Sequence, residues 1–197
     1  YKRQEVLRQP LEDRVVHITR VSGTVNYPCS FILVCAMNPC KCGYYGHATK
    51  ACTCTPKARL AYTAKISGPL LDRIDIHVEV PALDYNELSR TEPAEPSAEI
   101  RSRVIAARAF AAARTEGALT CNGLMTPADI RRFCRMDDAG GRLMQTAYDK
   151  FALSARAYDR ILKVARTAAD FDKSEIIRKE HIGLALQLRS MSKKYWQ

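Results

Sequence analysis

The sequence predicts two domains: an incomplete α/β domain over residues 1–81 and, after a linker at 82–97, an all-helical domain over residues 98–197. Three observations predict this α/β plus all-α fold class. The runs 30–37 and 74–80 are nearly continuously apolar, which is typical of strands buried on both faces of a sheet. Prolines and acidic residues gather in the linker. Beyond the linker, apolar residues recur with the period of a helix.

The chain is expected to open with a helix and a β-hairpin. Apolar residues at 6–7 lie among charged neighbours, and Pro10 then interrupts the helical pattern. Because the chain starts inside this helix without a capping residue, we expect it to be a fragment of a longer protein. Extended runs at 14–21 and 24–27 meet at the dipeptide Ser22-Gly23, which predicts a hairpin.

The two apolar runs are the predicted buried strands of the first domain. The first, SFILVCAM at 30–37, ends at the dipeptide Asn38-Pro39. The segment 39–58 is rich in Cys, Gly, Lys and Thr and is predicted to be an irregular insertion. A short helix is expected over 58–65, and the second strand at 74–80 ends at a proline.

Helical periodicity predicts a small bundle and no strand in the second domain. Ser97 and Thr126-Pro127 are helix-start signals. The predicted helices cover 98–116, 127–135, 138–152, 155–171 and 178–190.

The composition is that of an ordinary globular protein with a basic surface. Apolar residues make up 47% and charged residues 26% of the 197 positions, which excludes a disordered tail. The net charge of +10 favours polyanionic partners such as nucleic acid or nucleotide phosphates, although a merely solvated basic surface explains it equally well. No apolar run reaches the roughly 18 residues that span a bilayer, and no signal peptide opens the chain. We therefore expect a cytoplasmic protein with no membrane partner.

Eight cysteines without a secretory signal indicate a reducing compartment, where clustered thiols favour metal over disulfides. Cys40 and Cys42 form one pair and Cys52 and Cys54 a second. These four thiolates can close a tetrahedral structural zinc site, and His47 can replace one of them. Four reduced, metal-free cysteines are the alternative. The other cysteines are expected to be small buried apolar residues: Cys29, Cys35, Cys121 and Cys134.

Four motifs resemble the magnesium-chelatase-like competence ATPases of the ComM type. They are LRQPLED at 7–13, AMNPCKCGY at 36–44, KISGPLLDRIDIHV at 65–78 and LSARAYDRILKVARTA at 153–168. Their lengths and their order extend the resemblance over nearly the whole chain. It implies the C-terminal half of an AAA+ P-loop-type α/β domain, followed by a small helical lid domain.

The resemblance implies two catalytic residues. Asn38 takes the sensor-1 position, where an amide helps to orient the attacking water near the γ-phosphate; the alternative is a simple turn after a strand. Arg73 takes the arginine-finger position, where a guanidinium reaches the nucleotide site of a neighbouring subunit. The alternative for Arg73 is a salt bridge to Asp72 or Asp75. A working finger requires a homo-oligomeric ring.

The resemblance also implies a nucleotide-binding arginine in the second domain. Arg156 matches the sensor-2 position near the start of the helix at 155–171, where it contacts the γ-phosphate. Arg160 and Arg166 are weaker candidates on the same helix. A solvated arginine at a helix start is the alternative for all three.

Arg20, near the tip of the predicted hairpin, is a candidate for contact with a DNA phosphate. Related helicases carry a pore-facing hairpin at this place, and a structural β-arm is the alternative.

The phosphate-binding pattern G-x-x-x-x-G-K-[ST] is absent, as is an apolar strand ending in Asp-Glu. Both precede the helix at 7–11 in the family. We therefore expect these 197 residues alone not to hydrolyse ATP, and assign the cofactors ATP and Mg²⁺ to the longer protein.

Three hypotheses of function follow. The first is a part of a ring-forming AAA+ ATPase that remodels DNA, by helicase action or branch migration, in competence or recombination. The second is a chelatase-type ATPase that remodels a protein or inserts a metal. The third is a zinc-stabilised nucleic-acid-binding module without enzymatic activity.

Overall fold

The computed structural model describes residues 5–47, 49–81, 85, 89 and 93–189. These residues fall into two compact units, the first ending at Ala82 and the second running from Leu83 to Ser190. The linker predicted at 82–97 lies largely outside the described residues. The described chain mixes helices with one small two-stranded sheet.

Within the described residues, none of the helices combines the length and the apolar character that crossing a bilayer requires.

The first unit opens with the helix α2 (Arg8–Asp13) and an antiparallel hairpin. Pro10 lies inside α2, contrary to the prediction that it interrupts the helix. It occupies the first turn, where a backbone N–H has no helical partner to lose. Arg14 then adopts a left-handed conformation, with φ of 55°, and ends the helix.

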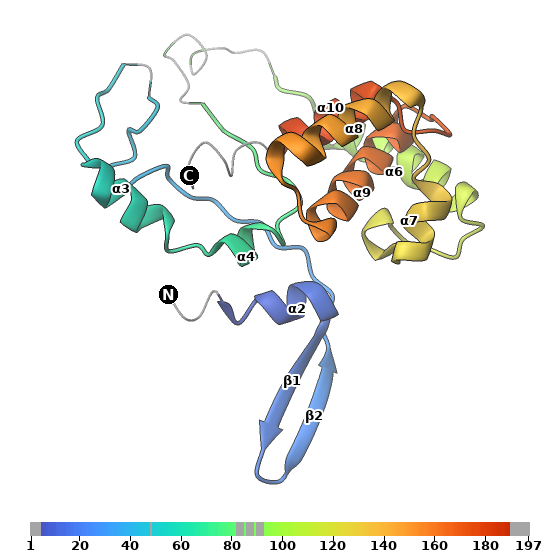
Figure 1. Cartoon of the computed structure of the whole chain (residues 1–197), viewed down its shortest axis with the longest axis horizontal. Coiled ribbons are helices and arrows are strands. Elements are labelled where there is room, and N and C mark those ends of the chain that lie inside the picture. The colour runs from blue at the N-terminus through green and yellow to red at the C-terminus, as the bar shows by residue number, and fades with distance from the viewer. Residues whose placement is uncertain (1–4, 48, 82–84, 86–88, 90–92, 190–197) are drawn as a thin grey trace. The chain divides into compact units, whose positions relative to one another are not determined.

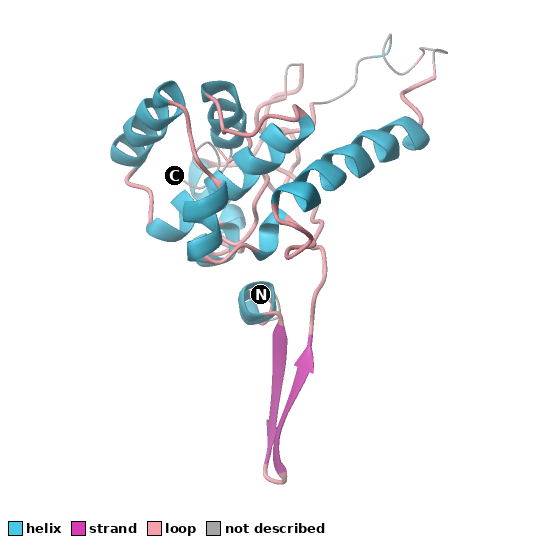
Figure 2. Ribbon diagram, turned by 90° about the vertical axis from the view of Figure 1, so that its right-hand side faces the viewer, coloured by secondary structure: helices cyan, strands magenta, loops and turns pink. Residues whose placement is uncertain are grey.

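The predicted hairpin is confirmed. Strand β1 (Val15–Arg20) pairs with β2 (Gly23–Pro28), and the register runs from the Val15–Pro28 pair to the Arg20–Gly23 pair at the tip. Gly23 has φ of +136°, a backbone conformation that is strained for residues with a side chain. Glycine therefore suits this turn. The hairpin extends from α2 as a long two-stranded arm (Figures 1 and 2). All of β2 and most of β1 are exposed, so the arm buries little apolar surface.

The two apolar runs were predicted to be buried strands, and in this structure they are not. Neither 30–37 nor 74–80 has regular secondary structure, and both are largely exposed. Ile32 retains 90% and Val80 retains 84% of its accessible surface. A strand of a parallel sheet requires a hydrogen-bonded neighbour and covering helices. Among the described residues, the only paired strands are β1 and β2.

Two short helices follow the cysteine-rich segment. Helix α3 (Pro56–Thr63) begins where the Thr55 side chain accepts a hydrogen bond from the backbone N–H of Ala58, and it confirms the helix predicted near 58–65. Helix α4 (Gly68–Leu71) is capped in the same way by Ser67 and was not predicted. Its residues Leu70 and Leu71 are buried.

The second unit is a bundle of helices, as the periodicity predicts (Figure 1). Side-chain caps set several of its boundaries: Thr126 and Asp129 form a capping box, and Asp137 and Ser154 each accept a backbone N–H bond. The helical elements are α6 (Ser97–Arg114), the 3₁₀ helix η1 (Asn122–Leu124), α7 (Pro127–Phe133), α8 (Asp138–Phe151), α9 (Ala155–Phe171) and α10 (Lys179–Gln187).

Helix α9 runs through the centre of this bundle and contacts α6, η1, α7 and α10. A parallel β-bridge between Met136 and Ile177 ties the segment after α7 to the segment before α10. One apolar core holds the helices together, and full burial of an Ile, Leu or Met side chain contributes about 1.5–3 kcal/mol to stability. The buried core residues are Met125, Ile130, Cys134, Met144, Ile161, Leu162, Ala165, Ala169, Ile177, Ile182 and Ala185.

Candidate functional site

The first unit brings together the four cysteines that were predicted to form a metal site. Their sulfur atoms all lie within 4.8 Å of one another. The Cys40 sulfur is 3.3 Å from that of Cys42 and 3.7 Å from that of Cys52, and the sulfurs of Cys42 and Cys52 are 3.5 Å apart. Four thiolates around one zinc ion, each at about 2.3 Å, lie about 3.8 Å from one another. The cluster, completed by Cys54, therefore has the dimensions of a tetrahedral zinc site.

Two glycines allow the loop between the cysteine pairs to turn back. Gly43 and Gly46 have φ of +85° and +83°, in the region where a Cβ atom is strained. The backbone N–H of Gly43 donates to the carbonyl oxygen of Cys40 at 3.1 Å, which closes a tight turn beneath the first pair. The loop can thus place the second pair against the first.

His47 does not join the cluster, although it was considered as a substitute ligand. Its Nδ1 accepts hydrogen bonds from the backbone N–H groups of Thr49 and Lys50, both at 3.2 Å. Its ring packs edge-on against Tyr44, with centroids 5.7 Å apart. Through these contacts, His47 stabilises the conformation of the loop.

The thiols of the cluster have unequal acidities. A hydrogen bond from the backbone N–H of Tyr44 lowers the pKa of Cys42 to about 5. For Cys54, a backbone hydrogen bond from Cys42 favours the thiolate, but the interaction with the Cys42 sulfur and partial burial outweigh it, and the pKa rises to about 11. Like-charge repulsion between close sulfur atoms opposes the loss of a second proton, and a divalent cation would remove that repulsion.

The four cysteines outside the cluster were all expected to be buried, and one of them, Cys134, is. Cys134 is buried beside the Met125 sulfur, at 3.8 Å, and burial raises its pKa to about 11. Cys29 is half-buried, whereas Cys35 and Cys121 are exposed, so the prediction is wrong for them. Cys35 lies in the apolar run that forms no strand here, which explains its exposure.

Arg73 is held by contacts within its own unit. Its Nε lies 3.0 Å from a carboxylate oxygen of Glu12 and donates to the carbonyl oxygen of Arg8 at 3.1 Å. One terminal nitrogen donates to the carbonyl oxygen of Pro69 at 2.7 Å. Only 12% of the side chain is exposed. The ion pair to Glu12 was not foreseen, because the two residues are far apart in the sequence.

Asn38 and Arg156, the predicted sensor residues, are both exposed. Asn38 follows the apolar run, and its amide nitrogen lies 3.9 Å from the place that a Cβ atom on Gly43 would take, so it faces the cysteine-rich loop. Arg156 is the second residue of α9, just after the capping residue Ser154. Asn38 belongs to the first unit and Arg156 to the second.

Arg166, a weaker candidate for nucleotide contact, is a structural residue in the second unit. Its side chain is fully buried. Its Nε donates to Asp170 at 3.1 Å, and its terminal nitrogens donate to the carbonyl oxygens of Ser174 and Glu175. Burial lowers the pKa of Arg166, and Asp170 opposes that shift. The interpretation as a nucleotide contact is therefore wrong for Arg166.

Sequence reasoning missed the polar network around Asp170. This carboxylate also accepts hydrogen bonds from Arg114, and from the amide of Asn122 at 2.7 Å. Arg166 and Arg114 therefore share a single carboxylate inside the bundle. Helical spacing places Arg166 and Asp170 on one face of α9, which is a signal for that pair, but nothing in the sequence joins Arg114 to them.

Arg20 lies at the exposed tip of the hairpin, directly before the turn. The residues 14–28 include two arginines and a histidine and contain no Asp or Glu. Exposed apolar side chains accompany them, with Val21 and Tyr27 among the most accessible. The arm thus offers a positive, partly apolar surface.

Two family models match the chain in sequence. One, described as magnesium chelatase, subunit ChlI, covers residues 1–88, and the other, described as magnesium chelatase, subunit ChlI C-terminal, covers residues 94–189. Together they span both units.

Similar proteins occur in several bacteria. The chain is 37% identical over 191 residues to the uncharacterized protein YifB of Escherichia coli, and 36% identical over 188 residues to the competence protein ComM of Haemophilus influenzae. It is also 37% identical over 171 residues to an uncharacterized protein of Mycobacterium tuberculosis. These alignments cover 96%, 95% and 84% of the chain but only 37%, 36% and 33% of the respective relatives. The chain therefore spans little more than a third of their length.

Proposed function

Because this chain belongs to the magnesium chelatase ChlI family, we propose that it is part of a ring-forming AAA+ ATPase that couples ATP hydrolysis to the remodelling of DNA. The observation that carries the proposal is the match of both family models, in order, along a chain that is also similar to a competence protein. ATP and Mg²⁺ would bind in a polypeptide of the relatives' length. This chain would supply the residues that sense and complete the nucleotide site.

Charge supports DNA as the substrate. The chain carries a net charge of +10, and its hairpin is exposed and free of acidic side chains. A guanidinium at the tip, such as that of Arg20, can contact phosphates of any sequence. Such contacts suit an ATPase that moves along DNA.

Asn38, Arg73 and Arg156 are the proposed nucleotide-site residues. Asn38 and Arg156 are exposed and can reach a ligand without breaking contacts in the core. Arg73 is already paired with Glu12, and we propose that it exchanges this partner for a phosphate across a subunit interface. A charged carboxylate can hold the finger in place until the nucleotide arrives.

A matched pair of variants in a protein of the relatives' length tests the role of Arg73. Arg73→Ala should lower the turnover of ATP by about 10³-fold or more, because arginine fingers contribute 10³–10⁵. Glu12→Gln should retain turnover within a few-fold, because it removes the resting partner and leaves the guanidinium. Steady-state ATPase rates and melting temperatures of both variants make the comparison. Equal losses in the two variants would show that Arg73 only stabilises the fold.

The family description favours a second candidate, a chelatase-type ATPase that remodels a protein or inserts a metal. The two candidates differ in their response to DNA. A DNA-remodelling enzyme should bind DNA with an affinity that falls steeply with salt, and DNA should stimulate its ATPase activity. An ATPase rate that DNA leaves unchanged would favour the chelatase-type function.

We further propose that Cys40, Cys42, Cys52 and Cys54 hold a structural zinc ion. The sulfur separations support this, and so does the chemistry of a four-thiolate donor set, which suits zinc. The ion would fix the loop beside Asn38 and thereby orient the amide.

A further inference from the structure

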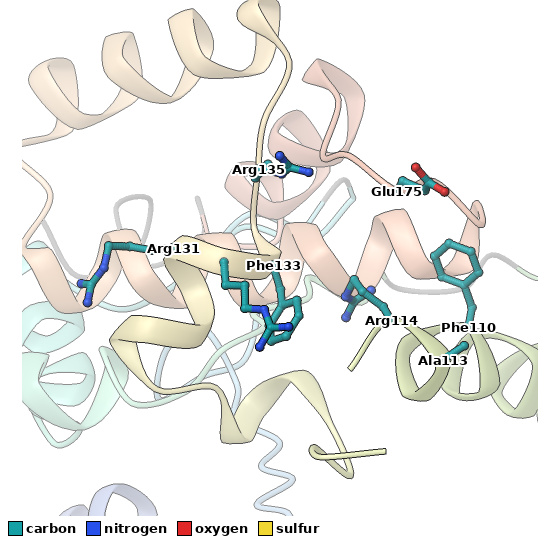
Figure 3. A pocket seen from close by; sticks show the side chains of 8 residues that line it. Phe110, Ala113, Arg114, Arg131, Phe133, Arg135 and Glu175 are labelled. Atoms are coloured by element: carbon teal, nitrogen blue, oxygen red, sulfur yellow. The ribbon is translucent and has the colours of Figure 1, made fainter. Parts of the chain in front are cut away.

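The helical unit contains a cavity lined with arginines that the proposed ATPase site does not use. Its volume is about 750 Å³, and it lies between α6, α7, the segment after α7 and the loop after α9. Arg131 reaches out from α7 at one end, and Phe110 and Glu175 mark the other end (Figure 3). The lining residues bring four guanidinium groups, two phenyl rings and a single carboxylate to this cavity. The residues that matter below are Phe110, Arg114, Arg131, Arg132, Phe133 and Arg135.

The outer arginines carry charge that the described part of the chain does not neutralise. Arg131, Arg132 and Arg135 are exposed, and no carboxylate of a described residue lies within ion-pair distance of them. The guanidinium of Arg132 stacks on the Phe133 ring, 4.9 Å from its centroid. The Asp129 carboxylate interacts electrostatically with Arg132, but it accepts its hydrogen bonds from Thr126 in a capping box.

The wall of the cavity adds a buried positive charge. Arg114 and Arg166 share the one carboxylate of Asp170, so this group of three carries a net charge of +1. The Nε of Arg114 is buried and has no hydrogen-bond partner among the residues described. Uncompensated charge away from water is costly. An anion in the cavity beside Arg114 would lower that cost.

The Phe110 ring decides between kinds of anion. Carboxylates of an acidic peptide would satisfy the arginines but would leave the Phe110 ring without a matching group, whereas Phe133 already packs against the Arg132 guanidinium. A nucleotide supplies a phosphate for guanidinium groups and a flat base for an aromatic ring. The volume lies in the range of sites for ligands of this size. In a duplex the bases are stacked inside the helix, so only an unpaired strand can offer one to the cavity.

We propose that this cavity binds one nucleotide unit of single-stranded nucleic acid, with its phosphate on the outer arginines and its base against the Phe110 ring. The inference extends the proposed function, on whose DNA substrate it rests, to a second contact far along the sequence from the hairpin. It requires no ATP and is a property of the helical unit.

Binding of a labelled single-stranded oligodeoxynucleotide to the 197-residue chain, followed by fluorescence anisotropy, tests the proposal. The cavity variant carries Arg131→Gln, Arg132→Gln and Arg135→Gln. We expect its Kd to rise at least tenfold and the slope of log K against log salt to become shallower by about 2, because each phosphate contact on a single strand contributes about 0.7. Phe110→Leu keeps an apolar side chain but removes the aromatic face, and should raise the Kd roughly tenfold.

The matched control carries Arg101→Gln, Arg142→Gln and Lys150→Gln, three exposed basic residues outside the cavity lining. It loses the same charge, so its Kd should change by less than threefold. Circular dichroism melting of every variant checks the fold.

Three outcomes would overturn the cavity as the site. They are equal weakening in the control and cavity variants, no binding of the oligonucleotide by the parent chain, and competition by a free nucleoside monophosphate at the same concentration as the oligonucleotide. None of them touches the ATPase function, which the Arg73 and Glu12 variants test separately.

Discussion

Cys42 has a pKa well below that of an ordinary thiol, whereas the pKa of Cys54 in the same cluster is raised. With its pKa at about 5, Cys42 is a thiolate at neutral pH, while the pKa of Cys54 lies at about 11. Four sulfurs within 4.8 Å can lose all their protons only if a cation offsets the charge. The separations of the four sulfur atoms are compatible with the proposed zinc site.

Replacement of one ligand should release the metal. The purified chain, kept reduced, should contain one zinc ion per chain by elemental analysis, and Cys52→Ser should lose most of it. Cys121→Ser alters an exposed cysteine in the other unit and should retain the zinc. Because a structural zinc site contributes directly to folding, chelation should also lower the melting temperature of the parent chain. Equal zinc contents in both variants, or a parent chain without zinc after growth in zinc-supplemented medium, would count against the site.

Single residues were predictable where their chemistry is local. The cysteine pairs are visible as a pattern, and the structure brings them together. Arg73 shows the limit, since its partner Glu12 lies in a different helix and only the fold joins them. Arg114 and Arg166 likewise share Asp170 only because the tertiary structure brings the three residues together. The roles of Asn38, Arg73 and Arg156 at a nucleotide remain predictions.

At the scale of elements, α8 shows how a cap and a close approach constrain adjacent glycines. The Asp137 side chain accepts the backbone N–H of Gly140 at 2.6 Å and so caps the helix. A Cβ atom on Gly140 would lie 2.8 Å from that carboxylate and 3.4 Å from the backbone of Arg178. A Cβ atom on Gly141 would meet nothing within 4 Å.

The two glycines should therefore respond differently to alanine. Gly141→Ala should stabilise the bundle by about 0.5–1 kcal/mol, because alanine is the better helix former. Gly140→Ala gains the same propensity but displaces the Asp137 cap, which is worth about 1 kcal/mol, so its net gain should vanish. Urea unfolding followed by circular dichroism measures both. A Gly140→Ala variant as stable as Gly141→Ala would show that the cap adjusts without cost.

Helices were easier to predict than strands because a helix makes its hydrogen bonds within one segment. The helical period of the apolar residues, together with the capping residues, predicted the ends of α6 to α10 to within a few residues. The hairpin was also predictable, since its strands are joined by a two-residue turn. The runs 30–37 and 74–80 have the composition of buried strands, but a strand forms only against another segment. Composition alone cannot supply that partner.

For the whole molecule, the two apolar runs at 30–37 and 74–80 are exposed in a chain that spans little more than a third of its relatives' length. Side chains such as Ile32, Val34, Val78 and Val80 are mostly exposed in the first unit. Large apolar side chains left exposed in this way are typical of interaction sites when they form one patch. The relatives are nearly three times as long as the aligned chain. The predicted α/β domain therefore leads us to expect that, in a protein of the relatives' length, both runs pair with further strands of a sheet.

Hydrogen exchange can test this completion directly. Amides at 31–37 and 74–80 should exchange rapidly in the 197-residue chain, because neither run lies in a helix or a strand there. In a protein of the relatives' length, they should exchange at least about 10³-fold more slowly, since pairing in a sheet buries and bonds them. The turn at 21–22 should stay fast and the middle of α9 should stay slow in both, which controls for global differences in stability. Equally fast exchange of the two runs in the longer protein would mean that they are not strands of a completed sheet, and the α/β interpretation of the first unit would fail with them.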